Sequence, residues 1–274
     1  MKFSEIKKSM NQVSPPIQPK IRLNVKDYSE IVLEWNPVSI KKHALFYQFV
    51  SDPNPDCISL IPDGCINVLF KCDEKDPKIT LSGIMLKENP LILDPNTTYF
   101  GFKPYSIVAV KDERLKFVEF LNESVELDYC LPDTEQLKEK ILLANDLKER
   151  MFVLIEYAKK YLINYDYIYD VVEHLAITMC ISKGQNRIGD LTSTIGYTER
   201  HCRTKFKDKL GINLSNYNGI MRFQNAVKSF YKKGSRNMTG VAHDAGFFDQ
   251  SHFIREFKKY ASDSPTQFKN SFSI

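Results

Sequence analysis

The stretch VAHDAGFFDQSHFIREFKKYASDSPTQF (241–268) decides the fold of the last third of the chain. It opens with an amphipathic helix pattern that ends at Gly246, and a glycine commonly ends a helix. An aromatic residue follows, and then Asp249, a residue type that caps helix N-termini. The next helix carries Phe253 and Phe257 four positions apart, so one of its faces is apolar. Helix, glycine turn and capped second helix form a helix-turn-helix pattern.

A second segment, NRIGDLTSTIGYTERHCRTKFK (186–207), repeats this pattern. Its first helix ends at Gly196, Thr198 takes the capping position, and Cys202 and Phe206 form the apolar face. Between the two segments, Leu214–Tyr231 predicts one long helix with apolar residues along one side: Tyr217, Ile220, Phe223, Val227 and Phe230. Such a rigid strut would fix the separation of the two second helices, and about 34 Å would let them enter successive major grooves of DNA.

Polar residues remain on the outward face of each second helix once the apolar residues face inward. Arginine and glutamine read guanine and adenine edges in the major groove, and a capped helix N-terminus favours a phosphate. We therefore predict contacts with double-stranded DNA, in the major groove, from two sets of residues. They are Thr198, Arg200, Arg203, Thr204 and Lys207 in the first unit, and Asp249, Gln250, Ser251, His252, Arg255 and Lys258 in the second.

The charge distribution agrees with a polyanionic partner. Residues 182–274 hold 16 lysines and arginines against 7 acidic residues, a net charge of +9, whereas the rest of the chain has a net charge of −5. A basic segment beside an acidic one indicates that only one of two domains meets nucleic acid.

The chain ahead of this basic segment predicts a β-domain and a helical connector. Residues 44–111 contain short β-branched and aromatic runs broken by Pro, Gly, Asn and Asp, which indicates an all-β sandwich or small barrel. A further strand is expected around Ile31–Trp35, and helices at 136–144, 147–165 and 169–181. We expect an α+β chain of three parts: 1–130 for sensing or dimerisation, 131–181 as connector and 182–274 for DNA binding.

The last third resembles the DNA-binding domain of the AraC/XylS family. The resemblance rests on IGDL…IGYTERHCRTKF, on GINLSNYNGIMRFQNAV and above all on residues 241–268; IPDGCINVLF (61–70) and FGFKPYS (100–106) extend it to a subgroup. It implies a cupin-like β-barrel that senses an effector, a homodimer, an activator role and RNA polymerase as a further partner. Carried over by position, the family's base-reading residues fall on Arg200, Arg203 and Thr204, and on Gln250, Ser251, His252 and Arg255.

Several residues depart from the family pattern. Thr204 stands where the family often has arginine, so the first unit is expected to read sequence differently from its relatives. Thr192 replaces a small alanine, Leu214 a frequent proline and Ser262 a common glycine, changes that the fold should tolerate. Arg222, on the long helix, is expected to brace the fold through a carboxylate.

A cupin-type metal enzyme with a helical tail is the alternative. Such a site needs two or three histidines and a carboxylate inside the barrel, but the predicted barrel holds only His43 and no H-x-H. The sequence also lacks a G-x-S-x-G motif, a P-loop and a G-x-G-x-x-G motif. We therefore expect no enzyme activity, no catalytic residue, no metal and no cofactor.

The N-terminal part leaves further alternatives open. Its domain either binds a small effector or serves only for assembly. Pro62–Gly64 is either a tight turn or a loop that binds a ligand. Lys103 and Tyr105 lie either in the core or at the rim of the barrel mouth. Cys57, Cys65 and Cys72 are close enough in sequence to meet on neighbouring strands, either as buried thiols or as a thiol sensor. No signal peptide or membrane span is evident, which favours a cytoplasmic protein.

Overall fold

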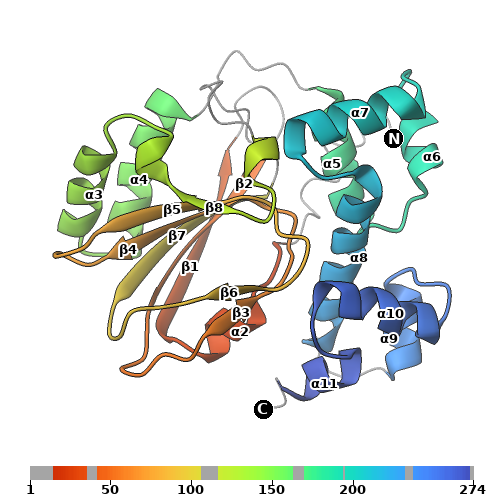
Figure 1. Ribbon diagram of the computed structural model, residues 1–274, viewed down its shortest axis with the longest axis horizontal. Coiled ribbons are helices and arrows are strands. Elements are labelled where there is room, and N and C mark those ends of the chain that lie inside the picture. Colours follow the sequence, from red (N-terminus) through yellow and green to blue (C-terminus); the bar gives the residue numbers. More distant parts are fainter. Residues whose placement is uncertain are drawn as a thin grey trace.

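A computed structural model describes residues 15–35, 42–105, 117–162, 170–193, 195–231 and 237–271. The last part of the expected β-domain, at 106–111, and the ends of two connector helices, at 163–165 and 169, lie outside these residues. The rest divides into a sheet-rich N-terminal domain, with α3 (Thr134–Leu143) and α4 (Leu147–Tyr161) on one side, and a helical C-terminal domain on the other (Figure 1).

The N-terminal domain is built on a six-stranded antiparallel sheet in the order β1-β2-β7-β4-β5-β8. Its strands are β1 Lys26–Trp35, β2 Lys42–Val50, β4 Asn67–Cys72, β5 Lys78–Ser82, β7 Thr98–Pro104 and β8 Ser124–Glu126. A separate pair, β3 Ile58–Leu60 and β6 Asn89–Leu91, lies below it in Figure 1. Within the described residues the large sheet is open, with β1 and β8 at its edges, so the expected β-domain is present but its sheet does not close into a barrel.

Aromatic residues cover one face of the sheet, because alternate side chains on each strand point to the same face. Phe46, Phe70 and Phe100 come from three neighbouring strands and are at most 2% exposed. They join one core with residues of α3 (Thr134–Leu143) and α4 (Leu147–Tyr161). These two connector helices therefore pack on the N-terminal domain.

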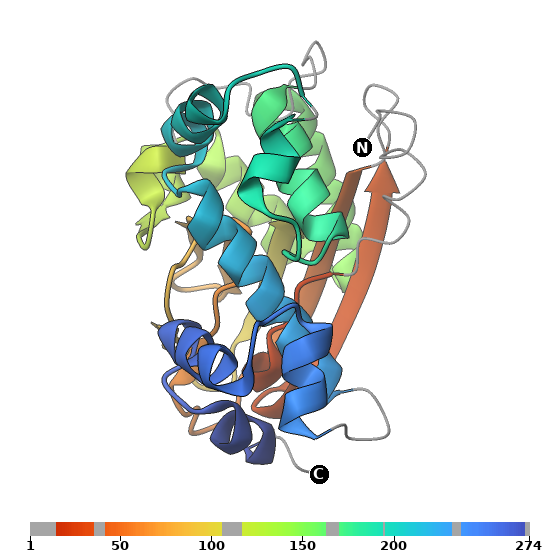
Figure 2. The ribbon, with the colours of Figure 1, turned by 90° about the vertical axis from the view of Figure 1, so that its right-hand side faces the viewer.

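The helical domain packs around a second core, which also takes in α5, the third expected connector helix. Its helices are α5 Val171–Ile181, α6 Ile188–Ser193, α7 Glu199–Leu210, α8 Leu214–Phe230, α9 Met238–Asp244, α10 Gln250–Tyr260 and α11 Pro265–Asn270. In Figure 2, α8 runs between the α5–α7 group and the α9–α11 group. Phe223, at its middle, is fully buried and meets the rings of Phe257 and Tyr260.

Hydrogen bonds connect the two domains. Gln224 on α8 donates from Nε2 to the Pro62 carbonyl (2.8 Å), and its Oε1 accepts from the Ile17 backbone N–H (3.0 Å). Gln18, next in the chain, donates to the Ile61 carbonyl (2.7 Å) and accepts from the Ile61 N–H (3.0 Å). The segment at 17–18 and the loop at 61–65 thus bind the middle of α8.

The expectation for Arg222 is revised, and the segment Pro62–Gly64 holds a buried carboxylate. Arg222 lies with its guanidinium 5.6 Å from the centre of the Phe247 ring and, among the described residues, has no ion pair with a carboxylate, so a cation–π contact replaces the expected brace. The chain bends at Gly64, which has φ +73°, and Asp63 beside it is only 7% exposed. Its carboxylate accepts from Lys103, itself 5% exposed, and from Gln18 (2.9 Å).

Candidate nucleic-acid interface

The first helix-turn-helix unit comprises α6 and α7. Gly196 takes a left-handed conformation (φ +74°) in the turn, and the Thr198 hydroxyl accepts from the His201 N–H (3.2 Å), which starts α7 as predicted. Cys202 and Phe206 are fully buried. The inward face of α7 is therefore the one that the sequence predicted.

The outward face of α7 presents Arg200, Thr204 and Lys207, which are all exposed. Arg203 differs, because it is half-buried and its guanidinium pairs with Glu199 one turn earlier (2.6 Å). A DNA base would have to compete with this carboxylate for Arg203. Since the ion pair is open to water, breaking it costs little, on the order of 0–1 kcal/mol.

The second unit, α9 and α10, repeats the arrangement. Gly246 (φ +80°) forms the turn, and the Asp249 carboxylate accepts from the His252 N–H (2.7 Å) to cap α10. Phe253 and Phe257 are fully buried, as predicted. The remaining predicted residues that are exposed share the opposite face or the cap: Asp249, Gln250, Ser251, Arg255 and Lys258.

His252 is the exception among the predicted residues of this unit. Its side chain is half-buried, and its ring lies edge-on to Phe247 at 5.6 Å between centres. Its main structural contact is therefore with the turn of its own unit, which leaves Gln250 and Arg255 as the more accessible groups.

Aromatic residues at the two turns were not among the predicted site residues. Phe248, next to the cap of α10, is 93% exposed, and Tyr197, before the cap of α7, is 53% exposed and stacks on His201. The sequence offered a signal, since an aromatic pair follows Gly246 and only one member can enter the core. Phe247 is the buried member, at 7% exposure.

The residues that depart from the family pattern are accommodated. Thr192 is 3% exposed, and its hydroxyl donates to the carbonyl of Ile188 (3.2 Å) or of Gly189 (3.1 Å). Leu214 is fully buried at the start of α8. The Ser262 N–H donates to Glu88 of the N-terminal domain (3.0 Å), a further contact between the domains.

Comparison with known proteins identifies the helical unit. Residues 191–271 match a family model described as a helix-turn-helix domain. Over 83 residues, the chain is 31% identical to the probable transcription factor PqrA of Proteus vulgaris, a match that spans 30% of this chain and 67% of that relative. This chain belongs to the AraC family. As a member of the AraC family it is a DNA-binding transcription regulator.

Solved structures of ToxT from Vibrio cholerae are more remote from this AraC-family chain. An apo lysine-to-alanine variant of ToxT is 13% identical, with a TM-score of 0.46 over 91% of this chain and 99% of that one. ToxT with a bound unsaturated fatty acid is 12% identical, with a TM-score of 0.40 over 88% and 94% of the two chains.

Within the described residues, no helix is long and apolar enough to cross a membrane.

Proposed function

We propose that this chain is a sequence-specific transcription activator that inserts α7 and α10 into successive major grooves of one DNA face. The observation that carries this proposal is shared by the two units. Each second helix buries three core residues and exposes arginine, lysine or glutamine to solvent. A helix of this kind can enter a groove without giving up its packing on the domain.

Arg255 and Arg200 are the residues that we propose as the main base readers. Each is exposed in the first or second turn of its helix, where recognition helices approach base edges. The caps at Thr198 and Asp249, together with Lys207 and Lys258, are better suited to hold the phosphate backbone.

The division of the chain at 130 and 181 also remains a proposal.

The test is fluorescence anisotropy with the purified full-length chain and DNA from upstream of its own coding region. Affinity for the specific duplex should exceed that for random-sequence duplex and fall steeply as salt rises, because bound phosphates release counterions. Arg255→Ala should weaken specific binding by about 1–3 kcal/mol, roughly 5- to 150-fold, and relax preference at one base pair.

Lys159→Ala is the matched control, because it removes one positive charge from α4, on the connector, away from both second helices. It should leave specific binding unchanged. Equal losses for Arg255→Ala and Lys159→Ala, or no binding above random-sequence background, would overturn the proposal. In a reporter assay, an activator raises expression from the bound promoter, and a decrease would refute that part alone.

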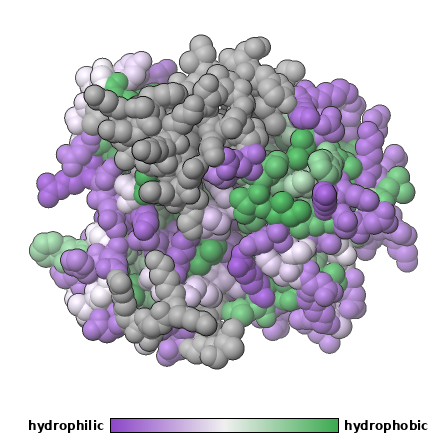
Figure 3. Space-filling view, turned by 180° about the vertical axis from the view of Figure 1, so that it is seen from behind, coloured by the Kyte–Doolittle hydropathy of each residue, from purple (hydrophilic) through white to green (hydrophobic). Residues whose placement is uncertain are grey.

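We further propose that the AraC-family chain acts as a homodimer and that its N-terminal domain senses an effector. Two large apolar side chains on the connector helices support dimerisation: Leu143 of α3 is 80% exposed and Phe152 of α4 is 54% exposed. From behind, hydrophobic residues gather on the side where α3 and α4 lie (Figure 3). Phe152→Glu should therefore halve the mass measured by sedimentation, and an unchanged mass would refute this surface.

A further inference from the structure

Phe248 is the most exposed of the large apolar residues in the described part of the chain, at 93%. Its neighbour Phe247 is 7% exposed and packs on Phe253, with 5.0 Å between the ring centres. The Arg222 guanidinium lies 5.6 Å from the centre of the Phe247 ring. The fold therefore uses one member of this aromatic pair and leaves the other in water.

The start of α10 does not require an exposed ring. Phe248 directly precedes Asp249, the residue that caps this helix. An apolar residue at this position often packs against the fourth residue of the helix, which here is Phe253. Phe253 is fully buried and has Phe247 as its partner, whereas Phe248 at 93% exposure cannot make that contact. The ring of Phe248 is thus free for a partner outside the fold.

The first unit has a shorter turn and no such free ring. One residue, Tyr197, stands there between the turn glycine and the cap at Thr198, whereas Phe247 and Phe248 both stand in the second turn. Tyr197 stacks on His201 of its own helix, with 4.9 Å between the ring centres. Within the described residues, no ring or cation stacks on Phe248. The extra residue in the second turn therefore adds a projecting aromatic side chain.

The backbone that carries Phe248 is held by neighbouring contacts. The Phe248 N–H donates to His252 Nδ1 (3.5 Å), and the Asp249 carboxylate accepts from the His252 N–H (2.7 Å). The His252 ring in turn lies edge-on to Phe247. A ring on a fixed backbone loses only rotation about two side-chain bonds when it binds, so the contact costs little conformational entropy.

We propose that the Phe248 ring packs against the methyl group of a thymine and makes α10 select that base. The inference rests on the proposed insertion of α10 into the major groove, where residues at the start of a recognition helix reach base edges. Thymine is the one base that presents a methyl group in this groove, and phenylalanine is among the side chains that contact it. Gln250 and Ser251, two and three positions later, are exposed and polar, so the ring adjoins groups that can bind neighbouring base edges.

The spacing along α10 predicts where this thymine lies relative to the base pair that Arg255 reads. Phe248 and Arg255 are seven positions apart. At a rise of about 1.5 Å per residue, this spacing corresponds to roughly 10 Å along the helix axis. Since successive base pairs are about 3.4 Å apart, the thymine should lie roughly three base pairs from the pair read by Arg255.

The experiment compares duplexes in which one thymine at a time is replaced by uracil. Uracil lacks the methyl group but pairs in the same way, so each duplex differs from the parent DNA by one methyl. Fluorescence anisotropy with the full-length chain and DNA from upstream of its coding region measures the affinity. We expect one replacement in each bound site to weaken binding roughly fourfold, the loss for one methyl-sized group that is no longer buried.

Variants locate the contact. Phe248→Ala should weaken binding to the parent duplex by about tenfold and should bind the thymine and uracil duplexes equally, because the methyl group has lost its partner. Phe248→Leu keeps an apolar side chain and should retain a preference for thymine. Both variants should melt at the temperature of the parent chain, because the ring is 93% exposed. Ile92→Ala is the matched control, since Ile92 is 81% exposed on the N-terminal domain, and it should keep both the affinity and the uracil effect.

The outcomes separate this inference from the proposed function. If no thymine responds, or if Phe248→Ala keeps the uracil effect, the inference is wrong even where Arg255→Ala still weakens specific binding. A chain without specific DNA binding refutes both. A third result also contradicts the thymine contact: Phe248→Ala binds DNA like the parent chain but no longer raises reporter expression, which assigns the ring to a protein partner.

Discussion

Lys103→Met is expected to destabilise the N-terminal domain strongly. Lys103 is 5% exposed and Asp63 is 7% exposed, and the Lys103 ammonium faces the Asp63 carboxylate. Burial alone would lower the pKa of Lys103, but the attraction and hydrogen bond of Asp63, with contributions from Tyr47 and Cys65, together raise it. The pair is therefore charged, and removing one partner leaves a buried ion without its counterion.

The expected loss is about 3–5 kcal/mol in the free energy of unfolding, the usual range for breaking a buried pair from one side. Two hydrogen bonds to Asp63 remain, from Gln18 (2.9 Å) and the Cys65 N–H (3.0 Å), which places the loss near the lower end. Urea unfolding followed by the fluorescence of Trp35 measures it, because Trp35 is the only tryptophan and lies on β1.

Lys26→Met provides the matched comparison. Lys26 pairs with Asp52 at 3.3 Å, but the two side chains are 53% and 41% exposed, so the loss should not exceed about 1 kcal/mol. In the double variant Asp63→Asn, Lys103→Met neither charge is buried, and stability should recover above that of Lys103→Met. If Lys103→Met cost no more than Lys26→Met, or if the two losses in the double variant simply added, the reasoning would be wrong.

Three further outcomes are expected. Asp249→Ala removes the side-chain acceptor for the His252 N–H and should cost about 1 kcal/mol in thermal unfolding, whereas no loss would mean that water replaces the cap. Gly101→Ala would place a carbon 2.0 Å from the Tyr47 ring and should cost about 1–3 kcal/mol in urea unfolding; an unchanged midpoint would show that the ring moves freely. Burial lowers the pKa of His174 below its usual value, so the unfolded chain binds the proton more readily. The stability due to neutral His174 is therefore complete above about pH 6.5 and lost as pH falls below it, and His174→Gln should flatten that part of a pH series of urea midpoints.

Both helix-turn-helix units were predictable because their determinants lie close together in the sequence. A capping side chain reaches a backbone N–H three residues later, and core residues four positions apart share one face of a helix. Thr198, Asp249, Phe206 and Phe257 accordingly take the positions that the pattern assigned to them. Which outward residues touch DNA stays a prediction, since exposure alone does not distinguish a base reader from a solvated charge.

The polar contacts within the N-terminal domain and with α8 were not predictable, because each joins residues far apart in the chain. Asp63 meets Lys103 across 40 positions, and Gln224 meets Pro62 across 162. The cysteines show the same limit. Cys57 precedes β3 and Cys65 precedes β4, strands that lie in different sheets, so closeness in sequence does not make them neighbours on adjacent strands.

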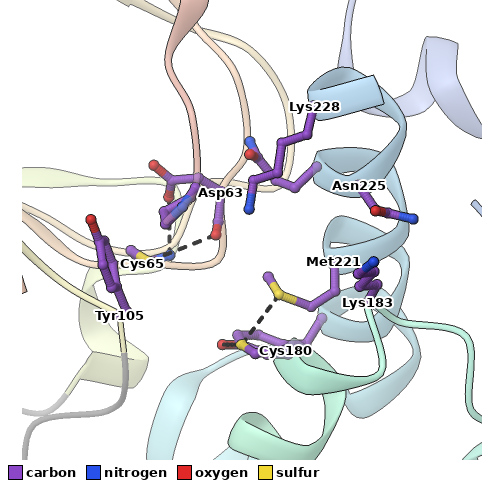
Figure 4. Close-up of a pocket in the computed structure, with 11 residues that line it drawn as sticks. Asp63, Cys65, Tyr105, Cys180, Lys183, Met221, Asn225 and Lys228 are labelled. Carbon is purple, nitrogen blue, oxygen red and sulfur yellow. Dashed lines mark hydrogen bonds between the residues drawn. The ribbon is translucent and has the colours of Figure 1, made fainter. Parts of the chain in front are cut away.

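Helix α8 connects these observations because two of its faces have different partners. Its apolar face, with Ile220 and Phe223, holds the cores of both helix-turn-helix units together. Met221, Gln224 and Lys228 follow the same helical spacing on another face and border a small cavity beside the loop at 61–65 (Figure 4). Gln224, on this second face, is only 3% exposed, and its hydrogen bonds to Ile17 and Pro62 tie α8 to the N-terminal domain.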